Sequence, residues 1–249
     1  MKNVVFITSI HNPTKPERSA VYDLSIDSWR RWCSERGHEL FVLDTQLTDL
    51  ELMSPIFYRH YCFDLLDEIP YNQICTVDAD TIIHPDCPDF FLLTSGRFSA
   101  VHNDGDYDWC IRSIENYQFE FGDTFAKPFD IWKYINSGFM VTSFKYKRLH
   151  DALLKFYWDN SDKVRSVQKK YGTGTDQPII NLFINELDID LNILPYQFNM
   201  QDMERKNVLH NMQFCKIPGI YHFNAVSGGP ERVNQLMKQT YDHFYRPTT

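Results

Sequence analysis

Two aspartates separated by a single alanine follow a short apolar run in the stretch QICTVDADTIIHPD (73–86). The run has the β-branched composition of a strand that is buried on both faces. Because side chains alternate along an extended chain, Asp78 and Asp80 can direct their carboxylates to one point. Two negative charges held together require a compensating cation, and carboxylate oxygens suit Mn²⁺ or Mg²⁺. The alternative is an acidic turn at a strand end, and the D-x-D pattern alone does not separate the two.

The residues before this pair predict alternating strands and helices. Strands are expected over 4–7, 39–44 and 73–78. Between them, apolar residues at helical spacing predict one helix that is stopped by Gly37 and a second over 58–69. This alternation is typical of crossovers onto a parallel sheet. It puts Asp78 at the carboxyl end of the third strand, where open α/β sheets bind ligands.

The second half of the chain is less regular. Further strands are expected at 97–102, 137–144, 191–195 and 219–223, and helices at 149–157, 175–187 and about 230–244. The segment 103–135 is acidic and aromatic without a clear period, so we expect an irregular region there. The sequence contains no internal repeat, low-complexity tract or linker, which favours one α/β domain.

Composition narrows the class of protein. The 249 residues carry a net charge of −8, which argues against a nucleic-acid-binding protein. The six cysteines form no C-x-x-C pair and no zinc spacing, so reduced thiols in an intracellular protein are expected. The N-terminus shows no targeting signal, and no window approaches the ~20 apolar residues of a membrane span. We therefore expect a cytoplasmic protein, soluble or peripherally bound to a membrane.

The loop after the first strand argues against the common phosphate-binding folds. Its sequence, SIHNPTKPERSA (9–20), contains no glycine. Dinucleotide-binding domains and P-loop proteins both need a glycine-rich loop at this place. A sugar-nucleotide pyrophosphorylase, which also uses such a loop, is disfavoured for the same reason. Phosphates bound here would need a cation to neutralise them.

Four motifs then occur in order: VDADTII (77–83), YINSGFMVT (134–142), GTDQPIINLF (174–183) and IYHFNAVSG (220–228). Together they resemble the nucleotide-sugar glycosyltransferases of the GT-A fold and are similar to glycosyltransferase family 8, the glycogenin and galactosyltransferase group. The resemblance implies a single GT-A (Rossmann-like) domain over 1–249, whose central, mostly parallel sheet is flanked by helices. Residues 1–102 would form the nucleotide-binding half, and 103–249 the acceptor-binding and metal-closing half.

The resemblance also implies an activity, a metal and a set of site residues. A sugar would pass from a nucleotide diphosphate sugar, a UDP-sugar, to a hydroxyl of a glycan or glycoconjugate. Mn²⁺ or Mg²⁺ would be held by Asp80 and His222, with Asp78 contacting either the metal or the donor ribose. The donor would be bound by Thr8, Ile10, Tyr22, Arg59, Asn136 and Ser137. Tyr22 also fits a core position, and Arg59 a solvated helix position.

Asp176 and Gln177, at a predicted helix start, are the expected catalytic residues. An ionised Asp176 could take a proton from the acceptor hydroxyl, as an inverting transferase requires. In the retaining pattern of family 8, the Asp-Gln pair instead positions the sugar, and the sequence leaves both roles open. The aromatic residues of 103–135 are candidates for an acceptor platform, namely Tyr107, Trp109, Tyr117 and Trp132.

The C-terminal motif departs from the family pattern. Family 8 members follow the histidine with H-x-x-G-x-x-K-P-W, whereas this chain has HFNAVSGGPERV and lacks the lysine and tryptophan. Arg232 or Lys216 is a candidate substitute for that lysine. A catalytically silent GT-A domain that binds a glycan or a protein partner is the alternative from another functional class.

Overall fold

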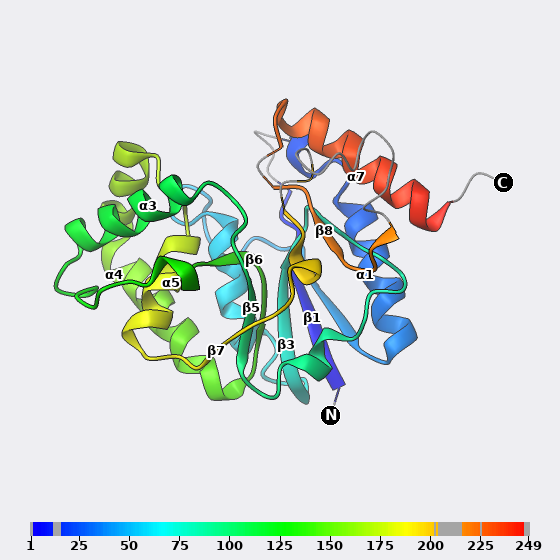
Figure 1. Ribbon diagram of the computed structural model, residues 1–249, viewed down its shortest axis with the longest axis horizontal. Coiled ribbons are helices and arrows are strands. Elements are labelled where there is room, and N and C mark those ends of the chain that lie inside the picture. Colours follow the sequence, from blue (N-terminus) through cyan, green and yellow to red (C-terminus); the bar gives the residue numbers. More distant parts are fainter. Residues whose placement is uncertain (1, 12–15, 202, 204–215, 225, 247–249) are drawn as a thin grey trace.

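The computed structural model describes residues 2–11, 16–201, 203, 216–224 and 226–246. A six-stranded sheet in the order β2-β1-β3-β6-β5-β7 forms its centre, and β4 and β8 form a separate two-stranded ribbon (Figure 1). The strands are β1 (Lys2–Thr8), β2 (Glu39–Leu43), β3 (Tyr71–Asp78), β4 (Thr81–Ile83), β5 (Phe98–His102), β6 (Ile135–Thr142), β7 (Leu191–Ile193) and β8 (Ile220–His222). In the large sheet only β6 runs against its neighbours. The α/β class with a mostly parallel sheet is thus confirmed.

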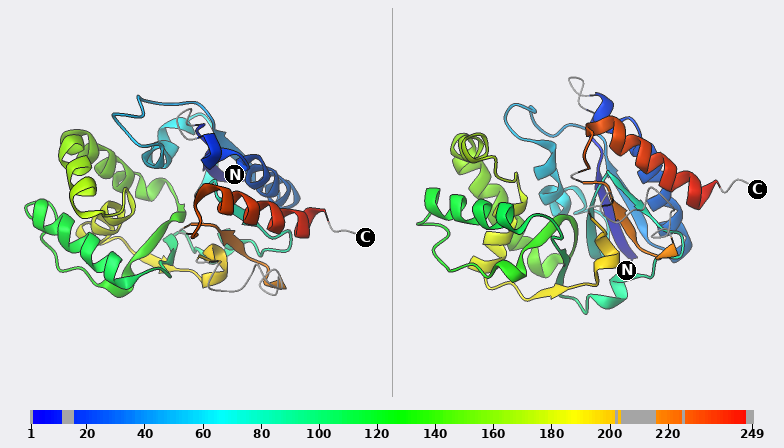
Figure 2. Two further views of the ribbon diagram at one scale, coloured as in Figure 1. Left: turned by 90° about the horizontal axis from the view of Figure 1, so that it is seen from above. Right: turned by 45° about the horizontal axis from the view of Figure 1, so that its top comes forward.

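Helices cover both faces of the sheet. The α-helices described are α1 (Tyr22–Arg36), α2 (Cys62–Leu65), α3 (Tyr107–Glu120), α4 (Lys147–Tyr171), α5 (Gln177–Glu186) and α7 (Gly229–Tyr245). In Figures 1 and 2, α3, α4 and α5 lie on one side of the sheet, and α1 and α7 lie on the other. None of the described helices is long and apolar enough to cross a membrane.

The two layers have separate apolar cores because side chains of a strand alternate between faces. In β1, Val4 and Phe6 pack into the core that contains α3, α4 and α5, whereas Val5 and Ile7 pack with Trp29 and Trp32 of α1. All four β1 side chains are at most 1% exposed. This matches the expectation of a strand buried on both faces.

Most sequence-based element boundaries agree with the structure to within a few residues, but three segments differ. The helix expected over 149–157 is α4, which continues to Tyr171. The helix expected over 58–69 is mainly a 3-10 helix, η2 (Pro55–Tyr61), followed by the single turn of α2. Four consecutive η2 residues, Phe57 to His60, are buried. A segment without an exposed face does not follow the 3.6-residue period on which the expectation rested.

The segment expected to be irregular contains α3. Asp106 caps this helix, because its side chain accepts hydrogen bonds from the backbone N–H groups of Asp108 and Trp109. The helix buries Cys110, Ile114 and Tyr117, at steps of four and three. This helical spacing of apolar residues is present in the sequence, but the acidic residues at the first turn made it hard to recognise.

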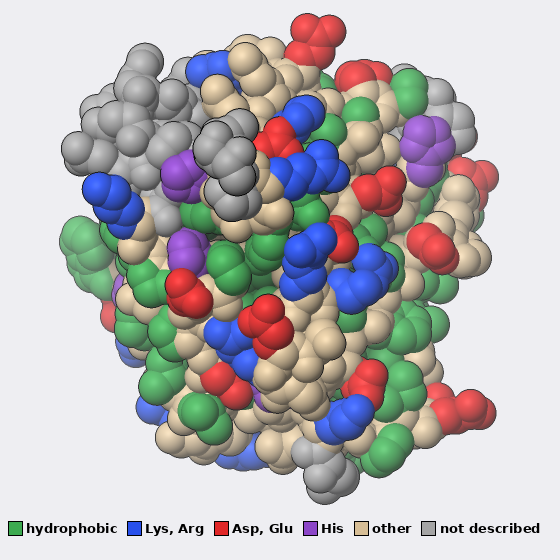
Figure 3. Space-filling model, turned by 90° about the vertical axis from the view of Figure 1, so that its right-hand side faces the viewer, with side chains coloured by type: hydrophobic (Ala, Val, Ile, Leu, Met, Phe, Trp, Pro, Cys, Tyr) green, Lys and Arg blue, Asp and Glu red, His purple; other side chains and the backbone are tan. Residues whose placement is uncertain are grey.

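The face formed by α1 and α7 carries mixed charge. Figure 3 shows Lys and Arg side chains interspersed with Asp and Glu on this side of the molecule. Arg31 pairs with Asp27 within α1, and Lys238 pairs with Asp242 within α7. Five of the six cysteines are free and buried, and Cys215 lies outside the described residues.

Candidate functional site

The D-x-D pair lies in the turn between β3 and β4. β3 ends at Asp78, Ala79 and Asp80 form a turn, and β4 starts at Thr81. The Thr81 hydroxyl donates to the backbone carbonyl of Asp78 at 2.8 Å, and the indole of Trp29 donates to the same hydroxyl at 2.9 Å. Because these bonds fix the turn, both carboxylates face one point, although only Asp78 belongs to the strand.

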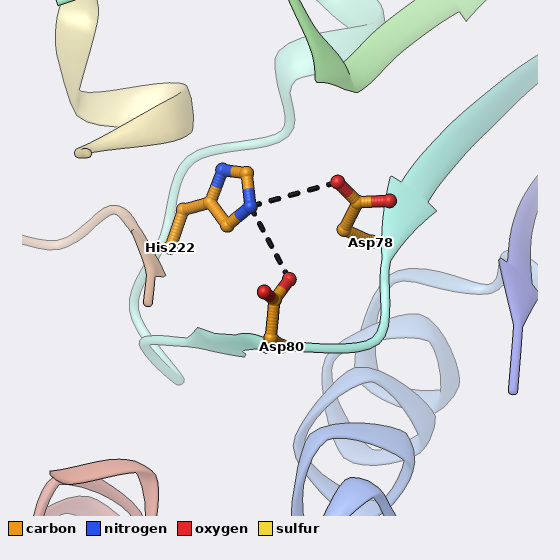
Figure 4. Close-up of side chains that lie close together, drawn as sticks. All are labelled: Asp78, Asp80 and His222. Carbon is orange, nitrogen blue, oxygen red and sulfur yellow. Dashed lines mark ion pairs between the residues drawn. The ribbon is translucent and has the colours of Figure 1, made fainter. Parts of the chain in front are cut away.

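His222 reaches this point because β8 pairs with β4. The antiparallel register sets His222 opposite Thr81, and the backbone N–H of Phe223 donates to the carbonyl of Asp80 at 2.9 Å. Nε2 of His222 lies 3.2 Å from Oδ1 of Asp80 and 3.6 Å from Oδ2 of Asp78 (Figure 4). One potential ligand atom from each of these residues lies within 4.8 Å of the others. The sequence-predicted metal ligands are therefore brought together from positions 142 residues apart (222 − 80).

Gly138 of β6 makes room for this cluster. A β-carbon at this position would lie 2.3 Å from Cε1 of His222 and 2.6 Å from Oδ2 of Asp78. A real β-carbon essentially never lies within 3.0 Å of such a neighbouring atom. Hence the N-S-G motif contributes a close backbone approach at the candidate metal site.

Arg59 compensates part of the negative charge. Its guanidinium donates to Oδ1 of Asp78 at 2.5 Å and lies 3.3 Å from Oδ2 of Asp176, and it also donates to the Ser137 carbonyl. The Arg59 side chain is 6% exposed, so it is not a solvated helix residue. Three carboxylates (Asp78, Asp80 and Asp176) and one guanidinium leave two negative charges when His222 is neutral.

The pKa shifts reflect this imbalance. Partial desolvation raises the pKa of Asp78; Arg59 opposes the rise and Asp80 adds to it. Burial alone would lower the pKa of His222, but the neighbouring Asp80 and Asp78 carboxylates raise it above its usual value. Burial would raise the pKa of Asp176, yet Arg59 and then His60 hold it below its usual value. Carboxylates in such surroundings favour a bound cation.

The donor set fits a divalent cation. Two carboxylates and one imidazole are ligands of Mn²⁺, and the carboxylates also suit Mg²⁺. Nε2 of His222 is buried and has no hydrogen-bond partner among the described residues, although the two carboxylates are near it. A buried polar atom of this kind is costly unless something binds it. A metal ion between Asp78, Asp80 and His222 would satisfy it.

A cavity of about 360 Å³ opens beside the cluster. Five of the residues expected to bind the donor line it, together with the second aspartate of the pair: Thr8, Ile10, Tyr22, Arg59, Asp78 and Asp80. Further lining comes from Ser19, Leu50, Ser54, Pro55, Ile56, Ala79 and Thr175. Tyr22 also packs against the apolar cores on both sides of α1, so its position is consistent with both roles considered from the sequence.

The other expected donor and catalytic residues lie behind this lining. Asn136 and Ser137 are each 3% exposed, and Asp176 is fully buried at the start of α5. The Ser137 backbone N–H donates to the side-chain carbonyl of Gln177 at 3.0 Å, and the Ser137 hydroxyl lies 3.4 Å from Asp176. Asp176 is the N-cap residue of α5.

Several site residues were missed from the sequence. His60 lies 3.4 Å from Asp176, and Asn199 lies 2.9 Å from Nδ1 of His222. Neither stands in a motif, and only their position beside motif residues in space identifies them. Neither Arg232 nor Lys216 is among the described residues that line the cavity, and Arg232 donates to Gln235 within α7.

The candidate acceptor aromatics have different surroundings. Trp132 is 69% exposed and Tyr107 is 46% exposed, and their ring centroids are 5.3 Å apart. Trp109 is partly buried and donates its indole N–H to the carbonyl of Gly172 at 3.2 Å. Tyr117 is fully buried in the core and cannot stack on a ligand at the surface. The structure therefore leaves Tyr107 and Trp132 as an exposed aromatic pair.

Comparison with known proteins gives a clear result for the fold. No family model matches the chain, and no curated protein matches it in sequence. Solved structures do match it. One is a glycosyltransferase involved in the glycosylation of the major capsid of PBCV-1, at a TM-score of 0.62 and 11% identity, with 95% of this chain and 98% of that chain covered.

Two further matches agree with the first. Mouse xyloside xylosyltransferase 1 matches at a TM-score of 0.51 and 14% identity, over 90% of this chain and 98% of that chain. The glycosyltransferase GlyE of Streptococcus pneumoniae matches at 0.50 and 13%, over 99% of this chain and 64% of that chain. The chain therefore has the fold of these glycosyltransferases, and the GT-A fold expected from the sequence is confirmed.

Proposed function

We propose that this protein is a metal-dependent glycosyltransferase, which transfers a sugar from a nucleoside diphosphate sugar to an acceptor hydroxyl. The observation that carries the proposal is the cluster of Asp78, Asp80 and His222 at the edge of a cavity, in a fold shared with glycosyltransferases. The cavity and the cluster share two residues, Asp78 and Asp80. A donor in this cavity would thus have its diphosphate beside the metal ligands.

In this reaction, a bound Mn²⁺ or Mg²⁺ would supply Lewis-acid stabilisation of the diphosphate leaving group. Asp78, Asp80 and His222 would hold the cation. Thr8, Ile10 and Tyr22, which line the same cavity, bind the base, for which uridine is the candidate. In this proposal the metal, and not the loop after β1, binds the diphosphate. This is consistent with the loop sequence, which contains no glycine and so lacks the glycine-rich backbone that binds phosphates in other folds.

Asp176 acts in this proposal as a positioning residue. Its carboxylate is fully buried and faces Arg59, His60 and the Ser137 hydroxyl. A general base must reach the acceptor hydroxyl directly or through one water, and a carboxylate surrounded in this way is poorly disposed to do so. The arrangement therefore favours the positioning role of the Asp-Gln pair over proton abstraction by Asp176.

We further propose that Tyr107 and Trp132 bind the acceptor, a carbohydrate. Aromatic faces offer a large rigid apolar surface with low entropy cost on binding, and sugar rings present apolar C–H faces to them. Trp132 precedes Asn136 by four residues, so the two lie at most about 14 Å apart along the chain. The backbone N–H of Asn103, four residues before Tyr107, donates to the carbonyl of Tyr134 at 3.1 Å. Each aromatic is thus four residues along the chain from a residue that contacts the candidate site, Asn136 or Asn103.

Thermal unfolding with ligands tests the metal and donor site. UDP with Mn²⁺ at about 100 times Kd should stabilise the protein by ~2.7 kcal/mol, which is on the order of 5–10 °C in Tm for a chain of this size. Asp80→Asn should abolish this shift. Asp86→Asn, a change to an 86% exposed side chain six residues away, should leave it intact and serves as the matched control.

Activity is measured next, as nucleoside diphosphate released from each sugar nucleotide with and without glycan acceptors. Release that depends on Mn²⁺ and Asp80 supports the transferase. Metal-dependent nucleotide binding without transfer or hydrolysis would instead favour a catalytically silent binding domain. If no nucleoside diphosphate stabilises the protein with any divalent metal, the proposed donor site is wrong.

A further inference from the structure

A chain of buried side-chain amides leads from the backbone of β6 to His222. Oδ1 of Asn136 accepts from the Gly138 backbone N–H at 2.9 Å, and Nδ2 of Asn199 donates to the same oxygen at 3.0 Å. Oδ1 of Asn199 lies 2.9 Å from Nδ1 of His222. Asn136, Asn199 and His222 are 3%, 0% and 1% exposed, so water cannot replace these contacts.

The backbone N–H of Gly138 determines which atom donates and which accepts in every hydrogen bond from Asn136 to His222. The N–H of Gly138 can only donate, so the Asn136 atom beside it must be the carbonyl oxygen. The Asn199 atom that contacts this oxygen must then be the amide nitrogen, and its other atom is the carbonyl oxygen. An oxygen without hydrogen can only accept, so Nδ1 of His222 carries a proton.

A second backbone N–H, that of Ser137, independently fixes the orientation of the Asn136 amide. Ser137 donates its N–H to Oε1 of Gln177, so the other Gln177 atom is the amide nitrogen. That nitrogen lies 3.3 Å from Oδ1 of Asn103, which also accepts from Nδ2 of Asn136 at 3.1 Å. Asn136 is thus oriented from both ends in the same way.

We propose that Asn199 is a positioning residue that holds His222 in the Nδ1–H tautomer, so that Nε2 is the atom available to the metal. The proposal rests on the metal site proposed above. Nε2 is the ring nitrogen that faces Asp78 and Asp80. The imidazole of a metal-binding histidine must be unprotonated at the ligand atom, and a partner on its other nitrogen fixes that state.

The backbone keeps Asn199 in place. The N–H of Met200 donates to the carbonyl of Ile220 and the N–H of His222 donates to the carbonyl of Met200, both at 2.8 Å. Asn199 is therefore tied to the strand that carries His222 and moves with it. Without the Asn199 oxygen, a neutral His222 would gain by placing its proton on Nε2, where Asp80 is 3.2 Å away. That proton would compete with the metal.

The first experiment compares Mn²⁺ affinities without nucleotide, from electron paramagnetic resonance of unbound Mn²⁺. Asn199→Leu keeps the approximate size of the side chain and removes the acceptor, and it should weaken Mn²⁺ binding 10–100-fold. Asn192→Leu is the matched control, because that amide, on β7, donates to the Leu93 carbonyl and to the Ser99 hydroxyl. The control should bind Mn²⁺ as the wild type does.

The second experiment reads the tautomer itself by ¹⁵N NMR of the imidazole in metal-free protein. The His222 signals are assigned by their loss in His222→Gln, and the pH is raised until the ring is neutral in the same spectra. We expect Nδ1–H in the wild type and a shift toward Nε2–H in Asn199→Leu. An Nε2–H ring in the wild type would overturn the inference, and this result does not require Asn199→Leu to fold.

Unchanged Mn²⁺ affinity in Asn199→Leu would also overturn it. If the wild type binds no divalent metal at all, the proposed metal site fails, and the tautomer measurement still decides whether Asn199 orients His222. The two failures are therefore distinguishable.

Discussion

Gly138 approaches His222 so closely that a β-carbon at this glycine would lie 2.3 Å from Cε1 of the imidazole. The two residues belong to different sheets, β6 of the central sheet and β8 of the two-stranded ribbon. Their contact is the place where the ribbon that carries the candidate metal ligand rests on the sheet.

Gly138→Ala should therefore displace His222. Since the clash involves the buried imidazole of His222 and the side chains of Asp78 and Asn136, we expect a loss of ~1–3 kcal/mol in unfolding free energy. Mn²⁺ affinity should fall at least about tenfold, because the histidine ligand moves. Gly37→Ala is a matched control for stability, since its left-handed backbone (φ 71°) makes alanine costly while no atom of the described residues lies within 4 Å of the new β-carbon. Equal Mn²⁺ binding in the two variants would contradict the prediction.

Arg59→Lys should be strongly destabilising. The guanidinium contacts Asp78, Asp176 and the Ser137 carbonyl at once, and an ammonium group cannot span them. We expect a loss of ~2–5 kcal/mol in unfolding free energy, measured by denaturant titration. The control is Arg97→Lys, at the solvent-exposed pair with Asp190, where the loss should stay below ~1 kcal/mol. Similar losses at both sites would show that Arg59 is not the bridge inferred here.

Stability should fall as the pH decreases below about 6.5. Nδ1 of His60 lies 3.2 Å from Nδ1 of His150, and burial lowers the pKa of both rings in the folded protein. The unfolded chain, with histidine pKa values near 6.5, then binds more protons than the folded protein, so each group's contribution is complete above that pH and is lost as the pH falls. The slope is up to ~1.4 kcal/mol per pH unit for each histidine.

Unfolding free energies at pH 5, 6, 7 and 8 measure this slope. In His150→Phe the slope between pH 5 and 6.5 should be smaller, because one titrating group is gone. Phe63 and Phe98 already lie against His150, so an aromatic ring is accommodated there. A variant with the wild-type slope would show that His150 does not titrate between the two states.

Trp132→Ala should affect the acceptor and not the donor. Removing an exposed ring that stacks on a sugar is expected to raise the KM for a glycan acceptor about tenfold, from a loss of ~1–1.5 kcal/mol. The KM for the sugar nucleotide should stay within about twofold. Phe119→Ala, at a 79% exposed ring on α3, is the control and should leave both constants unchanged. An increase in the donor KM alone would exclude Trp132 from the acceptor site.

Much of this protein could be read from local sequence. The apolar run before Asp78 predicted the strand, and the strand end predicted the carboxylates at the ligand-binding edge of the sheet. Helices with one exposed face, such as α1 and α7, were predicted with their approximate ends, because their apolar spacing is set by the helix itself. Where a segment is buried on all sides, as in η2, the spacing carried no such information.

The sequence determined which residue types are present for metal and phosphate chemistry, and the tertiary structure decided which of them meet. The pairing of β4 with β8 sets His222 beside Asp80, and no local pattern encodes that pairing. The contact of Arg59 with Asp176 and the hydrogen bonds from Asn136 through Asn199 to His222 also exist only because the fold brings distant segments together. Such contacts depend on strand register and burial across distant segments. Local propensity acts only over neighbouring residues, and only the folded chain brings these groups within hydrogen-bond distance.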